Sequence, residues 1–254
     1  MLRYIVITII KTLMLVLAFV IIFATPLKSK TIFASYEISW NALILGNLYW
    51  EFILNSKNYE FLITLESAGV SSKIYPFYGQ YYSKGEIINE TFNSKKYFSV
   101  WKAKKKQKTI DIVFENKKVK NLIFSKKQDI NPYVDFYNLK DPIDPISASL
   151  DLIINNDSKT IKNVFDGRRV YDLSVVKTKL KSIKNNENIL NQRNYKLNIE
   201  NYKNVWKDHN KTNLKEVEIT TGEMTNGILL PVDFKIKNKG LVLKIKYIDH
   251  SVLP

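Results

Sequence analysis

Residues 141–172, DPIDPISASLDLIINNDSKTIKNVFDGRRVYD, hold the best helix signal of this chain and a tight turn soon after it. Asp144 followed by Pro145 is typical of a helix start. The carboxylate accepts hydrogen bonds from the free N–H groups of the first turn, and proline at the first helical position has no N–H to leave unpaired. An apolar stripe with helical spacing follows, made of Ile146, Leu150, Ile153 and Ile154. The stretch therefore predicts a helix over Asp144–Asn155.

The turn comes with the only adjacent arginine pair of the chain. Asp166-Gly167 stands between Val164-Phe165 and Val170-Tyr171, an arrangement that is typical of a hairpin or a β-bulge. Arg168 and Arg169 follow directly. Because the residues around this turn have the pattern of strands, we expect the single helix to be an insert that packs on or into a sheet.

Most of the remaining chain alternates apolar and polar residues, which is the period of half-buried strands. From Tyr36 to Leu65, three such runs joined by short turns predict an antiparallel meander. The segment Gly69–Tyr82 fits either a short helix or a twisted strand broken at Pro76. The other predicted strands are Glu86–Phe92, Tyr97–Ala103, Lys108–Glu115, Lys118–Phe124, Ile161–Asp166, Arg168–Thr178, Arg193–Tyr202, Leu214–Thr221, Leu229–Lys237 and Leu241–Ile248.

About twelve strands and one confident helix predict a mainly β fold. So many antiparallel strands are expected to form a large curled sheet or open barrel, with the central helix capping or filling it. No internal repeat and no second domain are indicated. We therefore expect residues 31–254 to form one β domain.

Residues 1–30 are predicted to be a signal peptide or an N-terminal membrane anchor. Thr12–Thr25 is an almost uninterrupted apolar run that follows basic Arg3 and Lys11, and its length is typical of a signal peptide. Together with Tyr4–Ile10 it is long enough to span a bilayer. Removal and retention of the segment both stay open, and a buried core helix is the alternative to export. The basic flank predicts an exported, periplasmic domain, either soluble or tethered to the inner membrane.

The formal net charge is +15, and almost all of the positive charge is lysine. Scarce arginine argues against nucleic acid as a partner, because phosphate and base recognition favour the guanidinium fork. The lysine excess reflects either a compositional bias without function or a preference for anionic membrane surfaces. The cluster Lys102–Lys108 is likewise either a solvated hairpin tip that protects strand edges or a membrane contact. The chain has no cysteine, which excludes disulfides, cysteine nucleophiles and cysteine-bound zinc.

Four motifs occur together along the chain: Tyr36-x-Ile38-x-Trp40, Asp144-Pro145-Ile146-Ser147, Phe165-Asp166-Gly167-Arg168-Arg169-x-Tyr171-Asp172 and Leu230-Pro231. In this combination, most of residues 33–250 resemble the domain of unknown function 3108 family of exported bacterial envelope proteins. The resemblance implies a β-spiral-like sheet or open barrel, similar in shape to envelope-integrity proteins and periplasmic lipoprotein carriers. It brings no catalytic residues, and Tyr195 lies in the region where many members have a cysteine.

The sequence offers little chemistry for catalysis. His209 and His250 are the only histidines, and neither lies near a patterned serine and carboxylate, so a hydrolase triad is not indicated. Clustered metal ligands and glycine-rich phosphate loops are absent from the sequence, so no metal or other cofactor is expected. We expect no enzymatic activity.

The candidate structural motif consists of Asp144, Pro145, Ser147, Asp166 and Gly167. The adjacent Arg168 and Arg169 have three possible roles. They pair with Asp141, Asp144 or Asp172 in a structural network, they hold the acidic headgroup or carboxylate of a ligand, or, with the least support, they take part in catalysis.

Aromatic side chains on half-buried strands are expected in the core, yet inside a wide curled sheet they would line an apolar cavity. The candidates for such a ligand-binding lining are Trp40, Trp50, Phe52 and Phe61.

Three functional hypotheses remain. The first is a non-enzymatic envelope protein that binds a lipid, an acyl chain or a lipoprotein in its concave face and supports envelope integrity. The second is a structural or interaction protein whose groove takes a peptide or a protein partner. The third, an envelope hydrolase, has the least support. An apolar cavity beneath the helix would favour the first hypothesis, and a filled interior with an exposed sheet edge would favour the second. A charged residue in place of Trp50 or Phe52 is expected to separate them.

Overall fold

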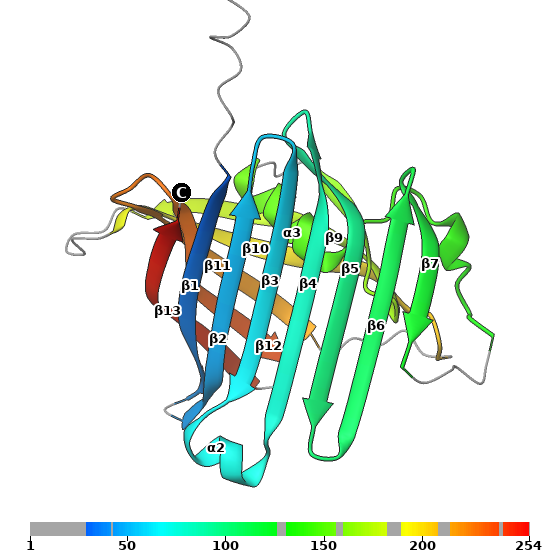
Figure 1. Cartoon of the computed structure of the whole chain (residues 1–254). Helices are drawn as coiled ribbons and strands as arrows, with labels where there is room; N and C mark the ends of the chain where they lie inside the picture. The colour runs from blue at the N-terminus through cyan, green and yellow to red at the C-terminus, as the bar shows by residue number, and fades with distance from the viewer. Residues whose placement is uncertain are drawn as a thin grey trace, which may run out of the picture.

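The computed structural model describes residues 29–41, 43–125, 131–155, 160–181, 189–207, 214–238 and 241–253. Their strands form one 13-stranded sheet (Figure 1). The strands are β1 (Lys30–Trp40), β2 (Leu43–Leu54), β3 (Asn58–Ser67), β4 (Phe77–Ile88), β5 (Thr91–Ala103), β6 (Lys106–Glu115), β7 (Lys118–Phe124), β8 (Ile161–Phe165), β9 (Arg169–Lys181), β10 (Ile189–Asn204), β11 (Leu214–Met224), β12 (Leu229–Asn238) and β13 (Leu241–Leu253).

The sheet consists of two antiparallel meanders joined at one seam. Its order is β7-β6-β5-β4-β3-β2-β1-β13-β12-β11-β10-β9-β8. All of its strand pairs join sequence neighbours except the pair of β1 with β13, and the neighbours β7 and β8 do not pair. That seam is antiparallel and runs from Thr31 opposite Leu253 to Trp40 opposite Leu243. The two terminal strands of the described domain are therefore held in the middle of the sheet, which leaves β7 and β8 at its ends.

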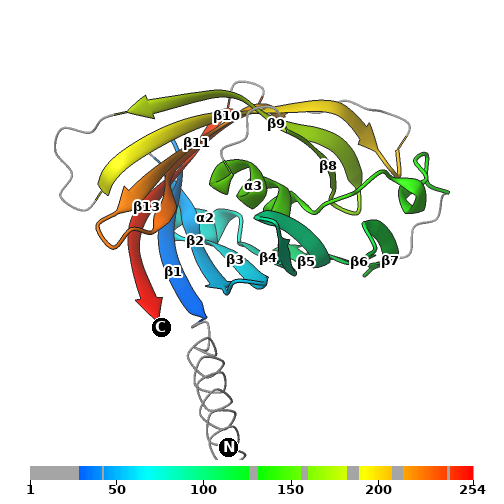
Figure 2. The ribbon, with the colours of Figure 1, turned by 90° about the horizontal axis from the view of Figure 1, so that it is seen from above.

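The sheet curls around the helix α3 (Pro145–Ile154), as Figure 2 shows from above. The short η1 (Phe136–Asn138) lies beside β7, in the connection that leads to α3. Ile143 adds a parallel bridge to Val164 of β8, with backbone hydrogen bonds from Ile143 N to Asn163 O (2.9 Å) and from Phe165 N to Ile143 O (2.9 Å). The predicted mainly β, curled and open antiparallel sheet with a central helix is thus confirmed.

The helix prediction is confirmed at both ends, with Asp144 as N-cap and Asn155 as C-cap. Three residues of the predicted apolar stripe pack against the core, but the stripe is not the most buried face of the helix. The stripe residues Ile146, Leu150 and Ile153 are half-buried and Ile154 is exposed, whereas Ala148 and Leu152 are fully buried. The reason is that the sheet wraps the helix on more than one side, since α3 contacts β4, β5, β8 and β9.

Side chains fill the interior in three apolar clusters. One contains Tyr36, Trp50, Phe52 and Phe61 from β1–β3. A second joins α3 to β8–β11 through residues that include Leu152, Val164 and Tyr195. The third joins the two ends of the sheet, with Ile112 of β6, Phe136 of η1 and Phe165 of β8 among its members. This last cluster covers the gap between β7 and β8 with packed side chains in place of a closing strand pair.

Several predicted segments need correction. Glu86–Phe92 is not one strand, because Asn89 (φ 49°) and Glu90 (φ 63°) form the turn between β4 and β5. The ambiguous Gly69–Tyr82 contains both expected elements, a short helix α2 (Gly69–Ile74) and the start of β4 after Pro76. The polar, asparagine-rich sequence of Lys179–Gln192 predicts a long exposed turn, but β9 extends to Lys181 and β10 begins at Ile189; residues 182–188 lie outside the described part. Asn238-Lys239-Gly240 predicts a hairpin turn, of which residues 239 and 240 also lie outside it.

The predicted signal or anchor lies almost entirely outside the described residues, which begin at Ser29. Within the described part, none of the helices has the length and hydrophobicity needed to cross a membrane.

Candidate functional site

A buried polar network ties α3 to the first meander. Asp144 is fully buried, and its Oδ2 accepts hydrogen bonds from the hydroxyls of Ser83 (2.9 Å), Ser94 (2.5 Å) and Ser147. Its Oδ1 accepts from the backbone N–H groups of Ile146 (2.9 Å) and Ser147 (3.1 Å), as expected of an N-cap. Burial raises the pKa of the Asp144 carboxyl, and the hydrogen bonds from the serines oppose that rise.

This network has the composition of a structural anchor. Ser147 Oγ also contacts Ser83 Oγ (2.9 Å) and the hydroxyl of Tyr59. The hydroxyls thus point at a buried carboxylate and at each other, whereas the serine of a hydrolase triad bonds to a histidine that acts as its base. His250 bonds instead to the Tyr247 hydroxyl (2.7 Å) and to Asn226 Nδ2 (3.2 Å) at a distant part of the sheet, and His209 lies outside the described residues.

A second polar contact fixes the other end of the helix. Asp151 of α3 forms an ion pair with Lys162 of β8. The same carboxylate accepts hydrogen bonds from Phe92 N (2.8 Å) and Asn155 Nδ2 (3.1 Å). Asp151 therefore connects the helix to both meanders of the curled sheet, at β5 and at β8.

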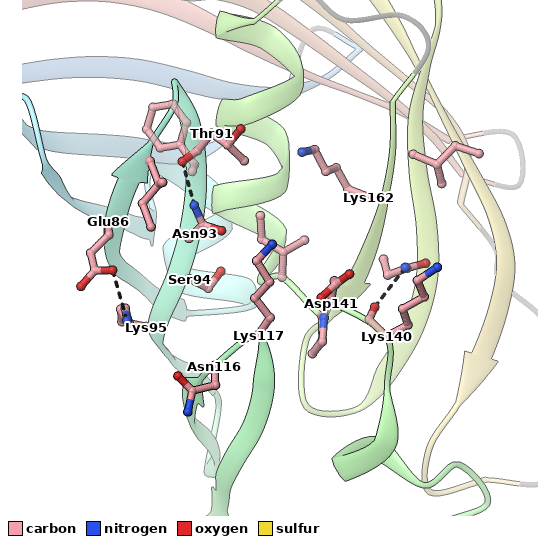
Figure 3. A pocket seen from close by; sticks show the side chains of 16 residues that line it. Glu86, Thr91, Asn93, Ser94, Lys95, Asn116, Lys117, Lys140, Asp141 and Lys162 are labelled. Carbon is pink, nitrogen blue, oxygen red and sulfur yellow. Dashed lines mark hydrogen bonds and ion pairs between the residues drawn. The ribbon is translucent and has the colours of Figure 1, made fainter.

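Next to this contact, the open side of the sheet forms a polar cavity of about 510 Å³ (Figure 3). Its walls are the end of β4 and the start of β5, the β6–β7 turn, the loop before α3, and β8. Four lysines line it, Lys95, Lys117, Lys140 and Lys162, against the two carboxylates of Glu86 and Asp141. The volume is in the range of small-molecule sites, and the balance of charges favours an anion.

The lysines differ in how firmly they are held. Lys95 pairs with Glu86 (3.2 Å), and Lys162 pairs with Asp151. Lys117 and Lys140 are exposed at the mouth, where Lys117 follows Asn116 in a turn with φ near 51–56°. Their ammonium groups are the ones best placed to meet a ligand that enters from solvent.

A second cavity of about 440 Å³ adjoins the first, and Phe92 lines both. Leu54, Ile87 and Ile154 supply apolar walls to it, and polar residues at the β2–β3 turn and at the end of α3 form its rim. A charged cavity and a partly apolar one therefore lie side by side around the β4–β5 turn.

The predicted aromatic lining is mostly core. Trp50 and Phe61 pack with ring centroids 4.7 Å apart, Phe52 and Phe61 5.2 Å apart, and Tyr36 stacks on Trp50 at 5.8 Å. Trp40 lies at the end of β1 and is 40% exposed, apart from this group. A ligand-binding role of these residues stays a prediction. A charged residue in place of Trp50 or Phe52 would disrupt packing and would not separate the functional hypotheses.

The Asp166-Gly167 turn is confirmed and has a packing role. Asp166 Oδ1 accepts from the backbone N–H groups of Arg168 (2.8 Å) and Arg169 (2.7 Å), and Gly167 adopts φ +85°. A Cβ on Gly167 would lie 2.6 Å from Ile110 Cγ2 of β6. The turn therefore needs glycine both for its backbone and for its contact with the opposite end of the sheet.

The arginine pair belongs to this turn. Arg169 Nη1 lies 3.5 Å from Asp166 Oδ2, and the Arg168 guanidinium lies 5.4 Å from the ring centroid of Phe124. Of the partners considered from the sequence, Asp144 is surrounded by serine hydroxyls and Asp172 accepts a hydrogen bond from Asn201 Nδ2 (2.6 Å). The ion pair of Arg169 is with Asp166 of the same turn. Burial raises the pKa of Asp166 and Arg169 opposes that rise, while burial lowers the pKa of Arg168.

Sequence reasoning named Ser147 but missed the lysines of the charged cavity and the two other serines at Asp144, Ser83 and Ser94. They come from strands, turns and a loop that are far apart in the chain, and no local motif marks them. Within the described ranges, no group of three or more histidine, cysteine or acidic residues is arranged to hold a metal ion.

The fold defines a class, a mainly β domain with a barrel-like, open sheet. It is similar to the crystal structure of a beta-barrel-like protein of domain of unknown function DUF1849 from Brucella abortus, with a TM-score of 0.53 and 13% identity over 91% of this chain and 100% of that one. No family model and no curated protein matches the chain. The likeness therefore supports a barrel-like fold, and membership of the 3108 family stays a prediction.

Proposed function

We propose that this protein is a non-enzymatic protein of the cell envelope that binds an amphipathic, anionic ligand, such as a lipid or the acyl chain and headgroup of a lipoprotein, and thereby supports envelope integrity. The observation that carries the proposal is the pair of adjoining cavities around Phe92, one lined by four lysines and one with apolar walls. An ammonium cluster suits a phosphate or a carboxylate, and apolar walls suit a hydrocarbon chain.

The proposal moves the ligand from the concave interior to the open side of the sheet. The interior is filled by three apolar clusters around α3, which leaves the described cavities between the ends of the sheet and at the end of the helix. A periplasmic location follows from the basic and apolar segment at residues 1–30 and is part of the proposal.

Binding of dodecyl phosphate to the full chain, measured by titration calorimetry, tests this function. We expect Lys117→Gln with Lys140→Gln to weaken binding by about tenfold or more, because both ammonium groups lie at the mouth of the charged cavity. Lys246→Gln is the matched control, since Lys246 is exposed on β13, away from both cavities. Equal affinity in the double variant and the control would refute the proposed site.

Native mass spectrometry of the protein purified from its own envelope extends the test. A bound mass that corresponds to a lipid or an acylated molecule is expected. A clean mass of the protein alone, which does not change when anionic lipids are added, would contradict the proposal.

A second candidate function is an interaction protein, and the filled interior favours it. The sheet order ends at β7, where Ile123 is exposed, and a terminal strand is a position where a peptide adds a further strand. A peptide or protein mass on the purified protein, with no lipid, would support this alternative over the first.

A further inference from the structure

The end of the sheet opposite to the two cavities carries exposed apolar side chains. α2 has no buried residue, and Val70 (59% exposed), Ile74 (73%) and Tyr75 (48%) project from it or directly follow it. The neighbouring β1–β2 turn adds Trp40, Leu43 and Ile44, which are also exposed. Such a group of large apolar residues in one place is unusual on a surface that meets only water.

These side chains sit on a firm support. Ala68 N (3.1 Å) and the Ser71 hydroxyl both donate hydrogen bonds to Leu45 O, so the start of α2 is attached to the start of β2. Phe77 stacks on Trp101 with centroids 5.6 Å apart, which attaches the end of the α2 segment to β5. The exposed apolar side chains therefore lie on a well-anchored part of the sheet end, where Figure 1 shows α2 at the bottom of the view.

Lysines surround the same surface. Segments 68–78 and 101–108 contain six lysines and no acidic residue: Lys73, Lys102, Lys104, Lys105, Lys106 and Lys108. All six are exposed. Lys104 N donates to Pro76 O (3.2 Å), and its Nζ lies 5.1 Å from the ring centroid of Tyr75, so the lysine-rich β5–β6 turn lies against the α2 segment.

We infer that this surface, which we call the α2 face, docks on an anionic lipid bilayer. Exposed aliphatic and aromatic side chains beside lysines suit the acyl and headgroup regions of such a membrane. The apolar groups enter the acyl boundary while the ammonium groups contact anionic headgroups. A soluble acidic protein would pair with the lysines but would leave the apolar side chains exposed to water. The absence of acidic residues from the two segments fits the negative charge of the lipid surface.

The α2 face lies far from the N-terminal end of β1 and from the proposed ligand site. Lys30 pairs with Leu54 at the end of β1 opposite to Trp40, and an 11-residue strand spans about 33 Å. The chain therefore enters the domain far from the α2 face. β4 likewise starts at the α2 face, and its last residue, Ile88, lines the charged cavity.

The absence of cysteine allows a direct test with the full chain. Ile74→Cys, labelled with an environment-sensitive fluorophore, reports on the α2 face, and Val176→Cys, exposed on β9, is the matched control. On addition of vesicles of about three parts phosphatidylcholine to one part phosphatidylglycerol, we expect a blue shift and a rise in intensity at residue 74 and none at residue 176. Vesicles of phosphatidylcholine alone, or about 0.5 M salt, are expected to remove the response.

Charge reversal provides the second variant. Lys102→Glu, Lys104→Glu and Lys105→Glu together are expected to weaken the response at residue 74 by at least about tenfold, because each lysine near an anionic surface favours binding. These side chains are exposed, so circular dichroism is expected to show an unchanged fold. No response at residue 74, an equal response at residues 74 and 176, or unchanged binding by the triple variant would each overturn the inference.

Discussion

Replacing Asp144 by alanine is expected to destabilise the domain by about 3 kcal/mol. The change removes the N-cap of α3, which is worth about 1 kcal/mol. It also takes the acceptor from three serine hydroxyls, and a buried donor left without a partner costs about 1–3 kcal/mol. Ser83, Ser147 and Tyr59 retain contacts with one another, so about one unsatisfied hydroxyl is counted, not three.

Asparagine at the same position separates the cap from the charge. Asp144→Asn keeps a carbonyl oxygen for Ile146 N and Ser147 N, and the serine hydroxyls can turn to accept from its amide. We expect a loss of about 1 kcal/mol, well below that of alanine.

Urea unfolding followed by circular dichroism measures these losses, with Asp135→Ala as the matched control. Asp135 is the exposed N-cap of η1, so Asp135→Ala removes a cap without leaving buried groups unpaired. A loss for Asp144→Ala no larger than that for Asp135→Ala would refute the idea that the buried network holds α3 in the sheet.

The pH dependence gives an independent check with a definite sign. Burial raises the pKa of Asp144 in the folded state. The folded protein therefore holds this proton more tightly, and its stabilising contribution is complete below the unfolded pKa of about 3.9 and is lost as pH rises through the folded pKa. Asp144→Asn lacks this loss. The stability advantage of the wild type over Asp144→Asn is thus expected to shrink as pH rises from about 4, and an advantage that grows would contradict the assigned direction.

Three further substitutions test the closure of the sheet. Lys162→Met leaves the buried Asp151 without its ion-pair partner and is expected to reduce the free energy of unfolding, measured in urea, by about 3 kcal/mol. Adding Asp151→Asn to the same chain is expected to restore most of this loss. No recovery would show that the pair is not coupled. Gly167→Ala is expected to reduce the free energy of unfolding by about 2 kcal/mol and to lower the melting temperature by several degrees, because the residue has φ +85° and its new Cβ would meet Ile110. An unchanged melting temperature would show that the turn does not pack on β6. Trp206→Phe removes the hydrogen bond from Nε1 to Gly167 O (3.0 Å) and is expected to reduce the free energy of unfolding by about 1 kcal/mol. The near-ultraviolet circular dichroism spectrum is expected to change, and an identical spectrum would place the indole outside the packed cluster.

Particular residues show which parts of the site were predictable. The cap at Asp144 and the turn at Asp166-Gly167 depend on neighbours one to three residues away, and both are confirmed. Ser83 and Ser94, which bond to Asp144 from β4 and β5, and the lysines of the charged cavity were not predictable, since these groups meet only through the sheet. The aromatic residues Trp50, Phe52 and Phe61 were placed on the correct face of their strands, but alternation alone does not tell a filled interior from a hollow one.

The sequence by itself determined the period of the strands, the bounds of α3 and the mainly β class, because hydrophobic periodicity and capping are local properties of the chain. Only the tertiary structure decided that β1 pairs with β13, that the interior is filled, and that four lysines line one cavity at the open side of the sheet. These features depend on strand order and curvature. Both arise when many distant segments pair at once, so the local sequence of one segment does not predict them.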